Sequence, residues 1–253
     1  MGLSLTDNRM HYTRAPILEA VIDIHVRLPA AVLLEQLAQI EWGEEHGSFG
    51  EPRPRLRGDV RFGGGAEGPT ITASQSQIGF TFGDVERTRI VQARLDGFAF
   101  SRLAPYDRWE PFCEEARQLW ERYCAAVKPL GVTRVAVRYI NRLELPLPLK
   151  NFRNYLRTFP EVSPDLPQGL SSFLMQLQIP QEDIADGVLI LNEGILESTD
   201  PNVAAVLLDI DLFRPVAMPV SGTDVWDALE ELHNRKNEVF EASITDRTRE
   251  LIR

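Results

Sequence analysis

One stretch constrains the fold more than any other, residues 132–146, which contain no glycine and no proline before the closing Pro146. The stretch is rich in β-branched and aromatic residues and therefore predicts one long β-strand. Because strand side chains alternate between two faces, one face is apolar and the other charged. The apolar face holds Val135, Val137, Tyr139, Leu143 and Leu145, and the charged face holds Arg134, Arg138, Arg142 and Glu144.

A similar strand is predicted at residues 15–29, which also ends in Leu-Pro. The same alternation assigns its residues to two faces. We expect the inward face to hold Leu18, Ala20, Ile22, Ile24, Val26 and Leu28, and the outward face to hold Glu19, Val21, Asp23, His25 and Arg27.

The two strands belong to an internal repeat with an offset of 117 residues. Leu28-Pro29 matches Leu145-Pro146, and the Asp-x-Trp motif at 107–109 matches that at 224–226. Two anchors at opposite ends of each half share this offset, which indicates a duplication. The halves are residues 15–129 and 131–245, with terminal segments at 1–14 and 246–253.

Each half has the same predicted order of elements, namely a strand, a short helix, three or four strands and a long helix. The short helices are expected at 30–40 and 149–157, and the long ones at 108–128 and 224–243. Asp107 and Glu110 are a plausible capping pair for the first long helix. The expected fold class is α+β, with one antiparallel sheet and both long helices packed on one face.

This element order resembles the duplicated fold of TATA-binding-protein-like domains. The resemblance implies that the first strands of the two halves meet antiparallel at the centre of the sheet. Their outward residues would then face each other, Glu19, Asp23 and His25 on one strand and Arg138, Arg142 and Glu144 on the other. We therefore predict that Arg138 or Arg142 has its guanidinium within about 4 Å of Glu19 or Asp23.

Several short motifs are spread along the chain: Ala15-Pro-Ile-x-Glu19, Arg138-Tyr-Ile-Asn-Arg142, Trp226-x-x-Leu-x-x-Leu-His233 and Phe240-Glu-x-x-Ile-Thr245. Through these motifs the chain resembles a sporadically distributed, functionally uncharacterised bacterial protein family. The resemblance implies a stand-alone bacterial protein, with a distribution typical of accessory factors in defence-type loci. It implies no catalytic residues.

Composition excludes several function classes. The net charge of −10 argues against nucleic acid as a general partner, because affinity for a polyphosphate depends on neutralising it. No apolar run approaches the roughly 20 residues of a membrane span, and the first residues lack the apolar core of a secretory signal. Cys113 and Cys124, eleven residues apart on one predicted helix, are too far apart for a disulfide. We expect a cytoplasmic protein without a membrane partner.

The outward residues of the first strand carry the candidate chemistry. Glu19, Asp23 and His25 could bind a metal or act as acid and base, completed by Asp209 and Asp211. The simpler interpretation is an ion-paired sheet face.

The arginines of the second long strand allow two further interpretations. Arg138 and Arg142 suit a carboxylate or phosphate, or pair with Glu19, Asp23 or Glu144. With Arg134 they form a strip that offers nucleic-acid binding as an alternative.

The remaining motifs favour structural roles. His233 on the apolar stripe of the last helix is expected to be hydrogen-bonded in the interior, and Asn141 on the core face is expected to tie a loop through its hydrogen bonds. The glycine cluster at 63–69 lacks the lysine of a phosphate loop and predicts a hairpin tip. We find no nucleophile, structural-zinc or cofactor motif, and predict no cofactor.

We therefore predict a non-enzymatic binding or regulatory module that recognises a protein or small ligand through the open sheet face. A metal-dependent or acid–base enzyme that uses Glu19, Asp23 and His25 is the alternative.

Overall fold

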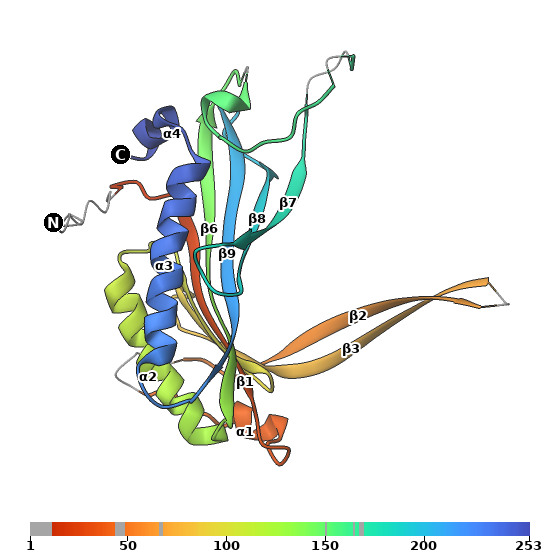
Figure 1. Cartoon of the computed structure of the whole chain (residues 1–253), viewed down its shortest axis with the longest axis vertical. Coiled ribbons are helices and arrows are strands. Elements are labelled where there is room, and N and C mark those ends of the chain that lie inside the picture. Colours follow the sequence, from red (N-terminus) through yellow and green to blue (C-terminus); the bar gives the residue numbers. More distant parts are fainter. Residues whose placement is uncertain (1–11, 44–48, 66–67, 150, 164, 167–169) are drawn as a thin grey trace.

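The computed structural model describes residues 12–43, 49–65, 68–149, 151–163, 165–166 and 170–253, with only the backbone for 59–65 and 68–73. The chain forms one antiparallel sheet in the order β2-β3-β4-β5-β1-β6-β9-β8-β7 (Figure 1). The strands are β1 Ile17–Arg27, β2 Arg53–Gly65, β3 Gly68–Gly83, β4 Arg89–Arg94, β5 Gly97–Leu103, β6 Gly131–Pro146, β7 Leu174–Gln181, β8 Gly187–Leu196 and β9 Val203–Met218.

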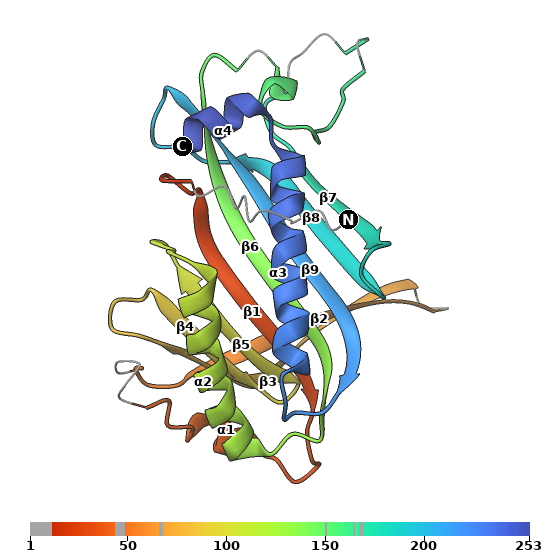
Figure 2. The ribbon, with the colours of Figure 1, turned by 60° about the vertical axis from the view of Figure 1, so that its left-hand side comes forward.

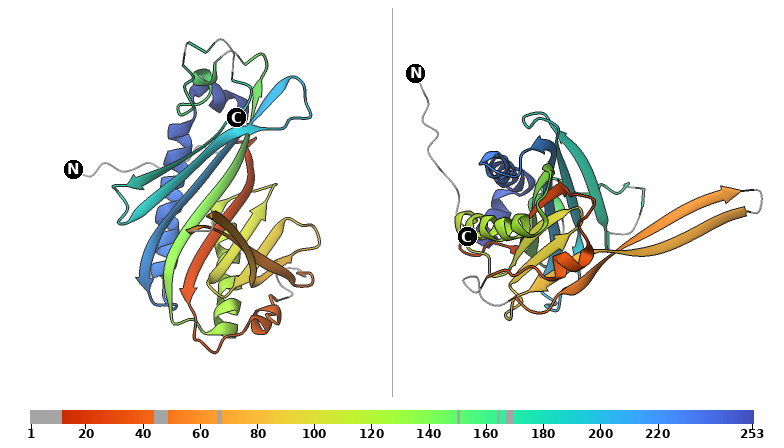
Figure 3. Two further views of the ribbon diagram at one scale, coloured as in Figure 1. Left: turned by 90° about the vertical axis from the view of Figure 1, so that its right-hand side faces the viewer. Right: turned by 90° about the horizontal axis from the view of Figure 1, so that it is seen from below.

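Two long helices, α2 (Trp109–Val127) and α3 (Asp224–Ser243), lie on the same side of this sheet (Figure 2). α2 packs against β5, whereas α3 packs against β6 and β9. The short helices α1 (Leu34–Ala38) and α4 (Asp246–Ile252) lie at the ends of the molecule. Within the described residues, the opposite side of the sheet carries no helix, and the β2–β3 hairpin projects from it (Figure 3). Among the described residues, no helix is long and apolar enough to cross a membrane.

The centre of the sheet is the antiparallel pair β1–β6, in which Ile22 lies opposite Val137. The alternation predicted from the sequence is seen in both strands. Ala20, Ile22 and Ile24 are fully buried toward the helices, as are Val135 and Val137. Leu18 is the exception, since 40% of its surface is exposed near the start of β1.

Aromatic side chains fill the space between the sheet and α2. Phe98 of β5 packs against Trp120 and Tyr123 of α2, with both pairs of ring centroids 5.8 Å apart. Phe100 stacks on Phe112 at 5.4 Å. Burial of this kind supplies roughly 25 cal/mol for each Å² of apolar surface removed from water. The spacing of these residues in the sequence is what makes α2 amphipathic.

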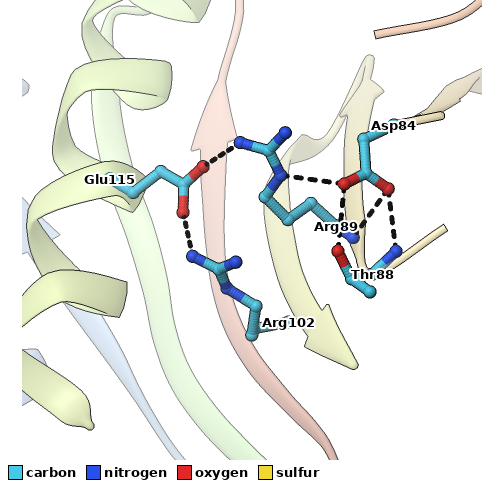
Figure 4. A network of polar contacts seen from close by, with 5 residues as sticks. All are labelled: Asp84, Thr88, Arg89, Arg102 and Glu115. Atoms are coloured by element: carbon cyan, nitrogen blue, oxygen red, sulfur yellow. Dashed lines mark hydrogen bonds and ion pairs between the residues drawn. The ribbon is translucent and has the colours of Figure 1, made fainter. Parts of the chain in front are cut away.

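α2 is also fixed to the sheet by a polar network (Figure 4). The carboxylate of Glu115 accepts hydrogen bonds from Arg89 of β4 at 2.9 Å and from Arg102 of β5 at 2.6 Å. Arg89 in turn donates to Asp84, 2.9 Å away, in the turn between β3 and β4. Asp84 is further held by Thr88. The network connects the β3–β4 hairpin to α2 on the side of the sheet that carries the helices.

Two predicted helices are corrected by the structure. Residues 149–157 contain only the 3₁₀ helix Phe152–Asn154, capped by Asn151, while residue 150 lies outside the described residues. No α-helix begins at residue 149, and the preceding Pro146 and Pro148 have no backbone N–H group to donate. The helix expected at 30–40 is shorter, Leu34–Ala38. The long helices fall where predicted, and the separate short helix α4 follows α3 after Ile244.

Candidate functional site

A cavity of about 290 Å³ lies on the helix-free face of the sheet, over its central strands. Its lining comes from both halves of the chain, from β2 and β4 on one side to β9 on the other. The lining residues are Glu19, Val21, Asp23, Arg55, Gln92, Arg94, Ala99, Ser101, Arg134, Ala136, Arg138, Ile140 and Asp211. The small side chains Ala99 and Ala136 lie directly opposite Asp23 on the neighbouring strands, which leaves the space open.

Asp23 is the centre of the lining. Arg94 of β4 donates to its Oδ2 at 2.8 Å and Arg134 of β6 to its Oδ1 at 3.3 Å. His25 Nε2 lies 3.0 Å from Oδ1. Burial alone would raise the pKa of Asp23, but the hydrogen bond from His25 and the charge of Arg94 outweigh burial and lower that pKa below its usual range. Asp23 is therefore a fixed anion.

Arg138 makes a second, separate ion pair. Its Nε and Nη2 donate to the two carboxylate oxygens of Asp209 at 2.8 and 2.7 Å, the bidentate geometry that guanidinium favours. Asn192 of β8 adds a third hydrogen bond to Asp209 at 2.9 Å. The Asp209 side chain is only 4% exposed. These contacts connect β6, β9 and β8 and form one border of the cavity.

Several polar groups of the lining lack partners among the described residues. Arg94 Nη2 and Gln92 Oε1 are buried without a hydrogen bond, and Arg94 is only 6% exposed. The carboxylate of Asp211 forms no hydrogen bond or ion pair with a described residue. Burial raises the pKa of Asp211, and the nearby charges of Arg134 and Arg138 only partly offset that effect.

The structure brings half of the predicted site residues to this cavity. Glu19, Asp23 and Arg138 line it, and His25 contacts Asp23 from just outside. Arg142 and Glu144 lie further along β6, where Arg142 Nε is 3.5 Å from Glu144 and Nη1 donates to a backbone carbonyl at 3.2 Å.

The predicted ion pair across the central strands is wrong in its partners. Within the described part of the chain, neither Arg138 nor Arg142 pairs with Glu19 or Asp23. Asp23 faces Ala136, so Arg134 and Arg138 each lie two positions away from it along β6. Arg138 is held by Asp209, and Arg134 reaches Asp23 instead. The expected acid–arginine cluster therefore exists at the centre of the sheet with other members.

The predicted metal-binding set does not come together. No group of three or more His, Cys, Asp or Glu side chains suited to a metal occurs among the described residues. Asp23 binds two guanidinium groups, and Asp209 is occupied by Arg138 and Asn192. Arginine therefore takes the positions in which a metal ion would have to bind these carboxylates.

Sequence reasoning missed Arg55, Gln92, Arg94 and Ser101 of the lining. These residues come from β2, β4 and β5, and the lateral order of these strands in the sheet cannot be predicted from local sequence patterns. The alternation of strand side chains could have indicated the face on which Ser101 lies, because Ser101 follows the buried Phe100 on β5. The same alternation separates Arg94 from the buried Ala93 on β4, but it does not indicate that Arg94 reaches across β5 to Asp23 on β1.

His233 and Asn141 behave as predicted for hydrogen-bonded interior groups. His233 stacks on Trp109 with ring centroids 4.1 Å apart, and its nitrogens lie 3.4 Å from Tyr139 Oη and 3.3 Å from Asn237 Nδ2. Asn141 donates to two backbone carbonyls, on β6 and β9, so it joins strands and not a loop.

A second depression, of about 430 Å³, lies beside α3 and is lined by Asp183, Ile184, Glu231, Asn234, Arg235 and Glu238. Arg235 forms ion pairs with both Asp183 and Glu238 there. This surface therefore satisfies its own charges, in contrast to the cavity over the central strands.

Comparisons with protein-family models, curated proteins and solved structures found no match. The central cavity combines separated charges, buried polar atoms without partners and a position shared by both halves of the chain. Its geometry and chemistry are therefore the grounds on which a function can be argued.

Proposed function

We propose that this protein is a non-enzymatic bacterial binding module, and that its ligand is a small polar molecule held in the cavity of the helix-free sheet face. The observation that carries the proposal is the buried pair of partnerless atoms in the lining, Arg94 Nη2 and Gln92 Oε1. A buried polar atom without a partner costs about 1–3 kcal/mol. A ligand that hydrogen-bonds to both atoms recovers that cost on binding.

The setting of these atoms supports recognition of a ligand. The lining residues come from strands of one continuous sheet, so a ligand meets a preformed surface and binding requires little ordering of the protein backbone. The volume is near the lower limit of natural ligand pockets. We propose a cytoplasmic setting, in keeping with the free cysteines Cys113 and Cys124.

The acid–base alternative that uses Glu19, Asp23 and His25 has less support. A general base works best when its pKa lies near the working pH, whereas the pKa of Asp23 is held well below that range. Its two oxygens are also engaged by Arg94, Arg134 and His25.

Nucleic-acid binding through Arg134, Arg138 and Arg142 is also disfavoured. Each of these guanidinium groups contacts a carboxylate of this chain, namely Asp23, Asp209 and Glu144. A polyphosphate would have to displace these contacts before it gained any counterion release.

The duplication belongs to the proposal as well, with halves at 15–129 and 131–245. Its support is the strand order, which runs outward from the β1–β6 pair as β5, β4 in one half and β9, β8 in the other. The long helices fit the offset of 117 residues, since α2 starts at Trp109 and α3 contains Trp226. Superposition of the halves tests this, and failure of α2 to fall on α3 would contradict it.

A cavity-filling substitution tests the binding function. Val21→Phe places a larger side chain in the lining, and Ile190→Phe makes a comparable change in the same cross-strand row but outside the cavity. A library of small polar compounds is screened by NMR amide shifts on the wild type. We expect hits whose affinity falls by at least about tenfold, 1.4 kcal/mol, in Val21→Phe and stays unchanged in Ile190→Phe.

Two results contradict the proposed function. One is a screen in which no compound shifts the amides of β1, β4 and β6. The other is a set of hits that Val21→Phe and Ile190→Phe weaken equally, because binding would then not depend on the cavity.

A further inference from the structure

The charges of the cavity are separated along the sheet. At the β2–β4 side, Arg55 makes no ion pair with a described residue, and Arg94 keeps a buried N–H group without an acceptor. At the β1–β9 side, Glu19 and Asp211 form no ion pair within the described part of the chain. The charged groups without an ion pair are thus the guanidinium of Arg55 at one side and the carboxylates of Glu19 and Asp211 at the other, and the buried N–H group of Arg94 adds a hydrogen-bond donor at the Arg55 side.

Internal pairing accounts for the remaining charges. Arg94 and Arg134 both contact Asp23, and Arg94 Nε also donates to Asp96 at 3.1 Å. Arg138 is neutralised by Asp209. These pairs fix the middle of the cavity. They leave its two sides to interact with a ligand.

The distance between the two sides follows from the strand order. Arg94 reaches Asp23 on β1, and β6 alone separates β1 from the Asp211 strand, β9. Neighbouring strands are about 4.8 Å apart, so two spacings put Arg94 and Asp211 roughly 10 Å from each other. A small molecule with a charge at each end and a few carbons between them fits this separation with a hydrogen bond at each end.

We propose that the ligand is a small zwitterion that carries a carboxylate and a protonated amine. The carboxylate accepts hydrogen bonds from Arg94 Nη2 and Arg55, and the ammonium group donates to Asp211 and Glu19. This inference rests on the proposed binding function and assigns the chemical class of its ligand.

Ligands with a single charge match the cavity less well. An anion satisfies the arginines but lies near the unpaired carboxylates of Asp211 and Glu19, which repel it. A cation satisfies those carboxylates but leaves the buried Arg94 N–H group without an acceptor. Only a ligand with both charges offers a partner to each side. Arg134, whose guanidinium lies 4.2 Å over the ring of Phe213, keeps the middle of the cavity ordered.

Three matched probes test the inference: 6-aminohexanoate, hexanoate and hexylamine. They share one carbon chain and differ in their charged ends. NMR titration of the wild-type protein is expected to show 6-aminohexanoate binding at least about tenfold tighter than either single-charge probe, which corresponds to 1.4 kcal/mol. The amides that shift should belong to the strands that line the cavity.

Two variants assign the ends. Asp211→Asn is expected to remove the advantage of 6-aminohexanoate over hexanoate, and Arg55→Gln its advantage over hexylamine. Arg55 is exposed and Asn preserves the shape of Asp211, so both variants should fold. Ile190→Phe, outside the lining, serves as the control with wild-type affinities.

The inference is overturned if hexanoate or hexylamine binds as tightly as 6-aminohexanoate, if neither variant changes the ranking, or if none of the three probes shifts the cavity amides. Each of these results leaves the proposed function intact as long as other compounds bind in a manner sensitive to Val21→Phe. The proposed function fails separately, when no compound in the wider screen depends on that position.

Discussion

Glu193 is predicted to make the stability of the protein depend on pH in a direction opposite to that of most carboxylates. It lies on the core face of β8, opposite Leu208 of β9, and is fully buried. Neither carboxylate oxygen has a hydrogen-bond partner among the described residues. Burial raises the pKa of Glu193 from 4.5 to about 8. The folded protein therefore holds a neutral carboxylic acid at this position at pH 7.

The magnitude follows from linkage between protonation and folding. Between pH 4.5 and pH 7 the unfolded chain releases this proton and the folded protein retains it. Stability falls wherever the folded state binds more protons. Each pH unit is worth about 1.4 kcal/mol, so Glu193 should reduce the free energy of unfolding by about 3 kcal/mol at pH 7 relative to pH 4.5. Above pH 8 the loss reaches a plateau.

The Glu193→Gln variant removes the titration and keeps the shape of the side chain. Urea denaturation of wild type and variant at several pH values between 4.5 and 8.5 measures the difference in the free energy of unfolding. We expect that difference to shift in favour of the variant by about 3 kcal/mol between pH 4.5 and 7. The exposed Glu182→Gln variant is the control, and its difference should not change with pH. A flat difference for Glu193→Gln would refute the reasoning.

Two further substitutions probe the interior and the sheet. Lys236 is 6% exposed, and burial lowers its pKa from 10.5 to about 7. Between these two pH values only the unfolded chain binds the proton, so the buried lysine destabilises the folded protein most at low pH. Lys236→Met should therefore raise the free energy of unfolding, measured by urea denaturation, by up to about 5 kcal/mol at pH 6 and by less at pH 9. Gly79→Ala places a Cβ 2.1 Å from the carbonyl oxygen of Ala93 and should lower the free energy of unfolding by at least about 1–3 kcal/mol. Gly58→Ala is the control, because its Cβ would have no atom within 4 Å, and it should leave the thermal unfolding temperature unchanged.

The sequence was sufficient for the central strands, the long helices and their faces, because these depend on local periodicity. The alternation in β1 correctly separated Ile22 and Ile24 from Asp23. The bounds expected for the long helices agree with α2 and α3 within about a residue. In the structure Glu193 lies on the core face of β8, two residues after the buried Leu191, as strand alternation requires. A carboxylate at such a position is therefore detectable from the sequence, although its lack of partners is not.

The members of the central ion-pair cluster could not be predicted, because they depend on lateral order and register. Alternation limits Asp23 to one face but leaves open which arginine faces it. Arg134 and Arg138 each lie two residues from Ala136, the residue opposite Asp23, so the register alone allows either as its partner, and Arg134 is the one that pairs with it. Arg94 enters from β4, two strands away from β1, and only the strand order brings it there. Contacts of this kind depend on the arrangement of the whole sheet and cannot be predicted from the sequence of a single strand.

The charge of the whole chain and the pairing of individual arginines lead to the same conclusion about polyanions by independent routes. A net charge of −10 opposes their approach at long range, and salt screens that effect beyond about 10 Å. Pairing acts at contact, where Asp209 holds Arg138 in a bidentate pair that salt screens far less because Asp209 is buried. High salt would therefore remove the first barrier and leave the second. The pairing of Arg138 with Asp209 therefore opposes a polyanion even where long-range repulsion is absent, which agrees with the proposal that the cavity binds a small zwitterion.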